Sequence, residues 1–210
     1  MLLELVLTLM IKLIPLQLFL NFAFLLVSLS VHAHQPVLVT EGDNTAEAPY
    51  IILQSEISKA IFSELKGNPH YFRIDSNSSF EFYAGITVPK IDGCPLSKKF
   101  SFEVLDANFE LIQRKNGENF KWWEWYEKHG KKWYWIGPEI GENFKSNRIY
   151  NAGTYYIRVY NKSNTGQYVL AVGGTESFPI TVIVRMIFSM PKINSSFWDD
   201  VECSKIEANG

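Results

Sequence analysis

The most distinctive chemistry of this chain lies in a short segment dense in aromatic rings. Residues 121–141 read KWWEWYEKHGKKWYWIGPEIG and hold all but one of the six tryptophans. Aromatic faces stack on the C–H surfaces of sugars and on cations, and the indole N–H remains a hydrogen-bond donor. Neighbouring carboxylates can accept hydrogen bonds from sugar hydroxyls. We therefore predict a ligand-binding site, for carbohydrate in the first place, built from Trp122, Trp125, Trp133, Trp135, Glu127 and Glu139.

Two other interpretations of this segment stay open. Buried tryptophan is ordinary in folded domains, so the rings could form a second apolar layer that covers an edge of the fold. Alternatively, Glu124, Glu127 and Glu139 could join backbone carbonyls as the hard oxygen ligands that calcium takes. The segment lacks the regular Asp spacing of an EF-hand, and its own lysines would pair with the same glutamates on a solvated loop.

One histidine stands where a metal ligand is expected if the N-terminal segment is removed. Val31-His32-Ala33 has the small-x-small pattern of a cleavage site, and cleavage after Ala33 would make His34 the first residue. Its amine and ring nitrogen, with a third nitrogen from His70 or His129, would suit copper. Copper-dependent polysaccharide monooxygenases look like this at their first residue, but nothing in the sequence marks the second histidine. A solvent-exposed start is the alternative.

The two cysteines, Cys94 and Cys203, offer a disulfide if the chain is exported. A bridge would attach the polar C-terminal tail to the body of the domain, and two free thiols are the alternative. The sequence has no CxxC motif, no Cys/His cluster at zinc spacing and no G-x-S-x-G. We therefore expect a non-enzymatic module, with copper at His34 as the enzymatic alternative.

Leu2 to Val31 is almost entirely apolar, which predicts a signal peptide over residues 1–33. Export to a secreted or extracytoplasmic location follows. An uncleaved anchor is the alternative, because Leu13–Val31 approaches the length that spans a bilayer. We expect a membrane partner only in that case.

Length and charge limit the number of domains and the kinds of partner that the chain can have. We expect one domain over residues 34–190 and a flexible tail over 191–210. The formal net charge is −2 with mixed signs, so no basic stripe indicates nucleic acid. The expected partners are a glycan or an envelope protein.

Most of the predicted elements are strands with one buried side. Tyr71–Asp75 and Phe80–Val88 alternate apolar and polar residues, and shorter runs follow around Phe102 and over Glu110–Arg114. Before them, the segment EISKAIFSELKG has apolar residues at helical spacing, which predicts a short helix over residues 56–66.

Ala152–Gly174, AGTYYIRVYNKSNTGQYVLAVGG, contains two further alternating runs with a polar loop between them, which predicts a β-hairpin. Residues 115–150 have no clear period, and we expect a long structured loop with short strand pieces. Residues 179–190 fit a helix or a strand, with Pro191 ending either one. The predicted fold class is all-β, a jelly-roll-like antiparallel β-sandwich with one short helix before its first core strand and an N-terminal signal or anchor helix.

Two motifs resemble a known family. HYFRID and, later, GTYYIRVYNKSNTGQYVLAVG resemble the bacterial pre-peptidase C-terminal type of domain, over roughly residues 50–175. This resemblance implies an exported jelly-roll-like sandwich that is not itself catalytic. Tyr155 also looks like a tyrosine corner, in which the hydroxyl binds nearby backbone. The family pattern lacks the Trp-rich insert at 115–150, so a special function is expected there.

Overall fold

A computed structural model describes residues 34–39, 44–96, 98–199 and 203 of the chain. The chain divides into two units, residues 1–32 and 33–210. The predicted signal peptide lies outside the described residues, so its cleavage stays a prediction. Among the described residues, no helix has both the length and the apolar character that a membrane crossing needs.

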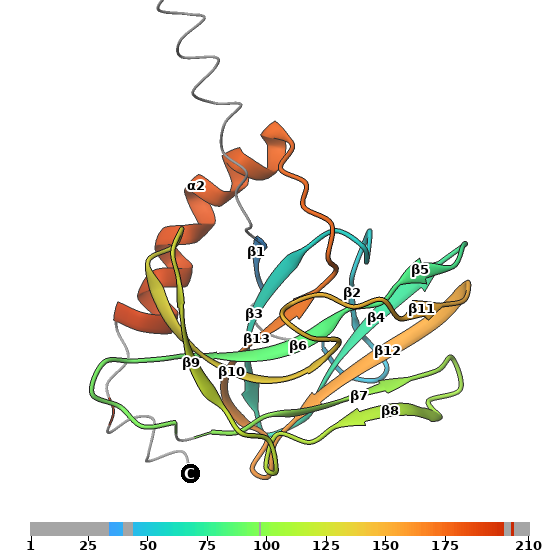
Figure 1. The fold of residues 1–210 in the computed structure, drawn as a ribbon, viewed down its shortest axis with the longest axis horizontal. Helices are drawn as coiled ribbons and strands as arrows, with labels where there is room; N and C mark the ends of the chain where they lie inside the picture. The colour runs from blue at the N-terminus through green and yellow to red at the C-terminus, as the bar shows by residue number, and fades with distance from the viewer. Residues whose placement is uncertain (1–33, 40–43, 97, 200–202, 204–210) are drawn as a thin grey trace, which may run out of the picture. The chain divides into compact units, whose positions relative to one another are not determined.

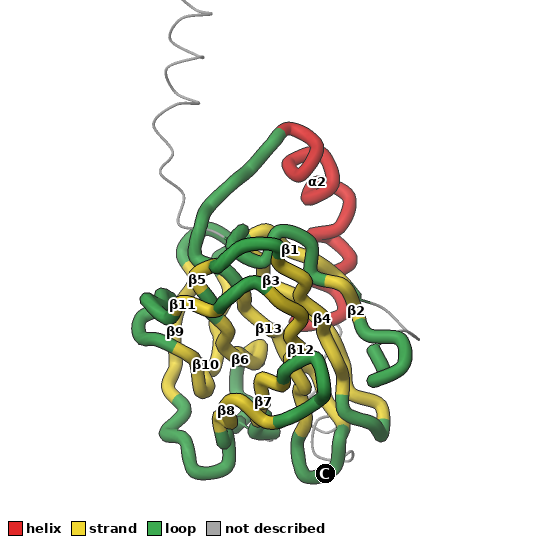
Figure 2. The backbone as a smooth tube through the Cα atoms, turned by 90° about the vertical axis from the view of Figure 1, so that its right-hand side faces the viewer, coloured by secondary structure: helices red, strands yellow, loops and turns green. Residues whose placement is uncertain are grey.

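The described part is a sandwich of two β-sheets (Figures 1 and 2). The six-stranded sheet has the order β1 (Gln35–Leu38), β3 (Lys59–Lys66), β13 (Thr165–Val172), β6 (Ala84–Pro89), β10 (Lys132–Ile140) and β9 (Trp123–Glu127). The five-stranded sheet has the order β2 (Tyr50–Ile51), β4 (His70–Ser76), β12 (Gly153–Tyr160), β7 (Ser101–Leu105) and β8 (Leu111–Lys115). A small ribbon joins β5 (Phe80–Glu81) to β11 (Ile149–Tyr150).

Strand pairing in both sheets is mainly antiparallel, and this confirms the predicted all-β sandwich. Two short edge strands differ, because β1 pairs with β3 and β2 pairs with β4 in parallel. The main core lies between the sheets, since alternate side chains of each sheet point to the other. Its largest fully buried members include Phe72, Phe102 and Ile157 from one sheet and Ile61 and Tyr168 from the other.

The predicted helix over residues 56–66 is wrong, because most of this segment is strand β3. Ile61 and Leu65 point into the main core, whereas Phe62 belongs to a second cluster on the outer face of the same sheet. A strand that is apolar on both faces loses the period of two that marks a half-exposed strand. Its apolar residues then imitate helical spacing.

The two runs in Ala152–Gly174 are strands β12 and β13, but they do not form the predicted hairpin. Strand β12 pairs with β4 and β7, whereas β13 pairs with β3 and β6 in the other sheet. The polar loop therefore crosses from one sheet to the other. The tyrosine corner is present, because the Tyr155 hydroxyl donates to the Asn151 carbonyl at 3.1 Å.

The C-terminal segment forms helix α2 (Ile180–Asn194), which continues into the π-helix η1 (Ser195–Asp199). This settles the open choice for residues 179–190 as helix. Pro191 lies inside α2, so the prediction that it ends the element is wrong. The predicted flexible tail is also wrong as far as Asp199, because Ile193 and Phe197 pack with Phe62 on the outer face of the six-stranded sheet.

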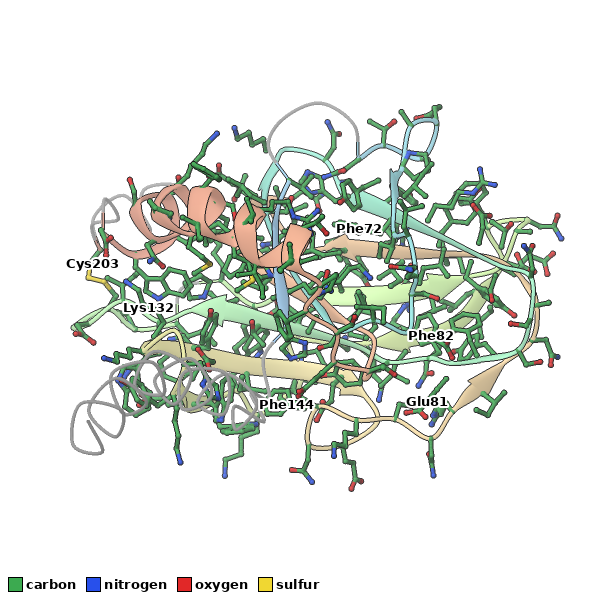
Figure 3. The ribbon with its side chains drawn as sticks, turned by 90° about the horizontal axis from the view of Figure 1, so that it is seen from above. Phe72, Glu81, Phe82, Lys132, Phe144 and Cys203 are labelled. Carbon is green, nitrogen blue, oxygen red and sulfur yellow. A yellow bond between two sulfur atoms is a disulfide. The ribbon has the colours of Figure 1, made fainter. Side chains whose placement is uncertain are left out.

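A disulfide joins Cys94, in the loop between β6 and β7, to Cys203, with the two Cα atoms 5.5 Å apart (Figure 3). The bridge spans 109 residues of sequence. It therefore fixes the end of the C-terminal segment to the body of the sandwich.

Candidate ligand-binding surface

The Trp-rich segment forms a β-hairpin at the edge of the six-stranded sheet, in place of the expected long loop. Strands β9 and β10 pair antiparallel, and β10 also pairs with β6 in the sheet. Residues directly opposite each other in such a pair point to the same face. The register places Trp133 opposite Tyr126 and Trp135 opposite Glu124. The hairpin therefore divides its aromatic rings between two faces.

One face carries a group that we call the aromatic–lysine patch, made of Lys90, Glu124, Tyr126, Trp133 and Trp135. The Tyr126 and Trp133 rings lie 5.1 Å apart at 47° to each other. They are 39% and 40% exposed, so both are accessible to a ligand. Lys90 lies 5.2 Å from the Trp133 ring and 5.7 Å from the Trp135 ring, and it forms an ion pair with Glu124 at 2.9 Å.

The other face of the hairpin packs onto the protein. Trp125 lies 5.0 Å from Phe144 and 6.1 Å from Tyr134, and Tyr134 meets Trp198 of η1 at 5.3 Å. Lys132 adds an ion pair with Asp199 at 3.1 Å. Burial raises the pKa of the Tyr134 phenol. Trp125, which we predicted as a ligand contact, therefore points away from the patch and toward the packed side.

Trp122 also has a structural role. Its ring packs against the main core, and its indole N–H donates to the Gly117 carbonyl at 2.8 Å. The ring leaves no room for a side chain at position 137, because a Cβ at Gly137 would collide with it. The interpretation of these rings as a cover for the sandwich thus fits Trp122 and Trp125, and the ligand interpretation fits Trp133 and Trp135.

The two predicted acidic ligand residues have partners inside the protein. Glu127 accepts hydrogen bonds from the backbone N–H groups of His129 and Gly130, so it closes the turn of the hairpin. Glu139 accepts from the Tyr83 hydroxyl at 2.9 Å and from the Phe144 N–H at 3.0 Å. Neither carboxylate belongs to the aromatic–lysine patch, whose only acid is Glu124.

The predicted metal ligands do not converge in the part of the chain that the structure describes, where no group of three metal-ligating side chains occurs. The three glutamates proposed for calcium contact Lys90, the hairpin turn and Tyr83. His34 hydrogen bonds through Nδ1 with the Ser58 hydroxyl, and burial lowers its pKa. His129 lies in the hairpin turn and His70 lies on β4. Copper and calcium remain predictions.

A cavity of about 340 Å³, which the sequence did not indicate, opens beside His70. Its lining includes the side chains of Asn44, Ser63, Gln167 and Phe197. Nδ1 of His70 lies 2.9 Å from the Tyr168 hydroxyl and 3.1 Å from the Ser63 hydroxyl. The sequence predicts no more for His70 than a second copper ligand, because its position in the HYFRID strand does not show which interior groups it meets.

Lowering the pH is expected to destabilise the fold through His70. Burial, helped by the charge of Lys66, lowers the pKa of His70 to about 4 from 6.5. The unfolded chain therefore binds the proton more readily, and stability present above pH 6.5 is lost as pH falls toward 4. A shift of this size would correspond to about 3 kcal/mol for a fully buried ring, and solvent around the partly exposed His70 ring reduces that amount. Urea unfolding of wild type and His70→Gln between pH 7 and pH 4 would measure the slope.

His34 acts in the same direction, because burial lowers its pKa too, so His70→Gln should reduce the slope without abolishing it. The control is His129→Gln, which removes an exposed histidine from the hairpin turn. An unchanged slope in His70→Gln would show that another group controls acid stability.

The outer face of the five-stranded sheet holds a second feature that the sequence did not indicate. Glu103 on β7 is 2% exposed and binds Arg114 at 2.6 Å and Arg158 at 2.5 Å. The Tyr160 hydroxyl donates to it at 3.4 Å. Because the carboxylate is enclosed by side chains of the same sheet, we interpret this cluster as structural.

Comparison with known proteins adds little to this geometry. No family model and no curated protein matches the chain. Among solved structures, it is similar to the pre-peptidase C-terminal domain of collagenase from Bacillus anthracis, at 11% identity and a TM-score of 0.30, over 69% of this chain and 98% of that one. At this distance the likeness concerns the fold alone.

Two glycosidase structures are also similar. The catalytic domain of a GH87 α-1,3-glucanase, in complex with tetrasaccharides, has 10% identity and a TM-score of 0.27, covering 57% of this chain and 22% of that one. A β-glucosidase from Paenibacillus barengoltzii has 12% identity and a TM-score of 0.22, covering 68% and 13%.

Proposed function

We propose that this chain is an exported, non-enzymatic β-sandwich module that binds carbohydrate through the aromatic–lysine patch. One observation carries the proposal. The register of β9 and β10 gathers Tyr126, Trp133 and Trp135 on one face beside Lys90 and Glu124, and leaves two of the rings about 40% exposed. Aromatic faces with charged hydrogen-bonding groups at their edge suit a ligand that has C–H faces and hydroxyl edges.

The geometry of the rings favours a single glycan chain over a flat crystalline surface. A planar surface would need coplanar rings, whereas Tyr126 and Trp133 are inclined at 47°. A sugar ring stacked on Trp133 would bring its hydroxyl groups near the Lys90 ammonium. Lys90 donates and Glu124 accepts, so their ion pair offers both kinds of hydrogen-bonding partner to the hydroxyls of one sugar.

The disulfide supports export. Disulfides persist in oxidising compartments and are rare in cytosolic proteins. The bridge between Cys94 and Cys203 therefore agrees with the apolar segment Leu2–Val31 as a signal for export. An extracytoplasmic protein meets cell-surface and secreted glycans, which are the ligands proposed for the patch.

Replacing Trp133 by alanine is expected to weaken glycan binding about tenfold, because loss of one aromatic contact costs about 1 kcal/mol or somewhat more. A glycan array would first identify a bound oligosaccharide. Isothermal titration calorimetry would then compare wild type with Trp133→Ala and Tyr126→Ala.

The matched control is Trp123→Ala. Trp123 is 44% exposed on the same hairpin but points to the opposite face, so its loss should leave affinity unchanged. Thermal unfolding would show that each variant is folded. Equal losses in Trp123→Ala and Trp133→Ala, or an array without any bound glycan, would overturn the proposal.

A further inference from the structure

Helix α2 carries an apolar stripe on its outer side. Ile180, Ile183, Val184, Ile187 and Phe188 repeat at intervals of three and four residues, so they lie along one side of the helix. All five are exposed, and Ile180 and Phe188 are 77% exposed. A continuous row of large apolar side chains of this kind marks an interaction surface.

The inner side of α2 is apolar as well. Val182 and Ile193 are buried, and Ile193 packs with Phe62 and Val169 of the six-stranded sheet. A helix that is apolar on both sides is normally covered on both. Within the part of the chain that the structure describes, the sandwich covers only the inner side, so the outer side has the character of a surface that contacts another apolar phase.

The charges of α2 indicate the nature of that phase. The residues of α2 include no acid, and the two cations are Arg185 and Lys192. A helix with an apolar stripe and flanking cations suits the interface of a bilayer with anionic headgroups.

The first strand of the fold, β1, lies next to α2. The apolar segment Leu2–Val31 leads directly into β1, and β1 packs against α2. The Gln35 side chain also donates to the carbonyl of Ser177, just before α2 begins. The start of β1, which follows this apolar segment in the sequence, therefore lies beside α2.

We infer that the outer stripe of α2 lies in the interfacial region of a lipid bilayer, with Ile187 and Phe188 among the inserted side chains. This inference is independent of the glycan proposal, because the stripe and the aromatic–lysine patch share no residue. A bilayer on this face accounts for the uncovered apolar row and for the absence of acidic residues in α2.

Photo-crosslinking in vesicles tests the inference. The full chain is reconstituted in vesicles of phosphatidylcholine and phosphatidylglycerol, with Phe188 replaced by the photoreactive p-benzoylphenylalanine. The matched control carries the same replacement at Phe109, a 43% exposed phenylalanine in the turn between β7 and β8. Crosslinking is used in place of flotation, because an attached N-terminal segment could float the chain by itself.

The expected result is a phospholipid adduct at position 188, detected by mass spectrometry, and none at 109. Adding Ile187→Asp should abolish the adduct at 188, because it places a carboxylate in the stripe. A crosslink from 188 to a second copy of the chain, to residues 2–31 of the same chain, or to no molecule would each overturn the inference. Equal lipid adducts at 188 and 109 would also overturn it.

Discussion

Replacing both Cys94 and Cys203 by serine is expected to lower the free energy of unfolding by about 5 kcal/mol, because a bridge that closes a loop of roughly 100 residues restricts the unfolded chain by that amount. The loop here spans 109 residues. The bridge also holds Cys203, four residues after η1 ends, and η1 itself contains Phe197, which is buried against the outer face of the six-stranded sheet. For a domain of this size, the midpoint of thermal unfolding should fall by about 10 to 20 °C.

Differential scanning calorimetry of the oxidised protein, the reduced protein and the double variant measures this effect. Reduction of wild type should reproduce the midpoint of the double variant, and reductant should leave the double variant unchanged. The prediction would be contradicted if oxidised and reduced wild type unfolded at the same temperature. The experiment also separates the disulfide from the alternative of two free thiols.

The second large effect is expected at Glu103. Glu103→Ala removes the carboxylate that Arg114 and Arg158 share. It should cost about 1 to 3 kcal/mol, because the arginines lose their buried hydrogen-bond partner while their side chains, 56% and 34% exposed, keep part of their contact with water. Arg158 is the residue most affected, since its Nε is already buried without a hydrogen-bond partner among the described residues. Urea unfolding at neutral pH measures the loss.

Asp75→Ala is the matched control. Asp75 also lies on the outer face of the five-stranded sheet and also pairs with an arginine, Arg73, at 3.0 Å. Its side chain is 45% exposed, however, so solvent screens the pair and its loss should cost less than about 1 kcal/mol. Similar losses in Glu103→Ala and Asp75→Ala would show that burial does not set the strength of the Glu103 cluster.

Alternation along the chain was sufficient to predict the fold class and most strands. The runs that became β4, β7 and β12 bury one face and show the other to solvent or to polar neighbours, so their period of two is visible in the sequence. The tyrosine corner at Tyr155 was predictable for a similar reason, because it depends on residues within four positions of each other. Local signals of this kind do not require knowledge of distant neighbours.

The structure predicted from sequence was wrong where elements far apart in the chain determine the conformation of a segment. Strand β3 is apolar on both faces because α2, more than a hundred residues later, covers its outer side. The polar loop after β12 fits both a hairpin and a crossing between sheets, and only the pairing of β13 with β3 distinguishes the two.

The candidate site shows the same division between local and distant information. The density of aromatic rings over residues 121–141 directed attention to the right segment. The register of β9 against β10 then decided that Trp133 and Trp135 share a face with Lys90 while Trp125 turns toward Phe144. The sequence alone determined the all-β class and the segment in which the candidate site lies. Only the tertiary structure decided which faces are covered, because burial of a face depends on elements that are far apart in the chain.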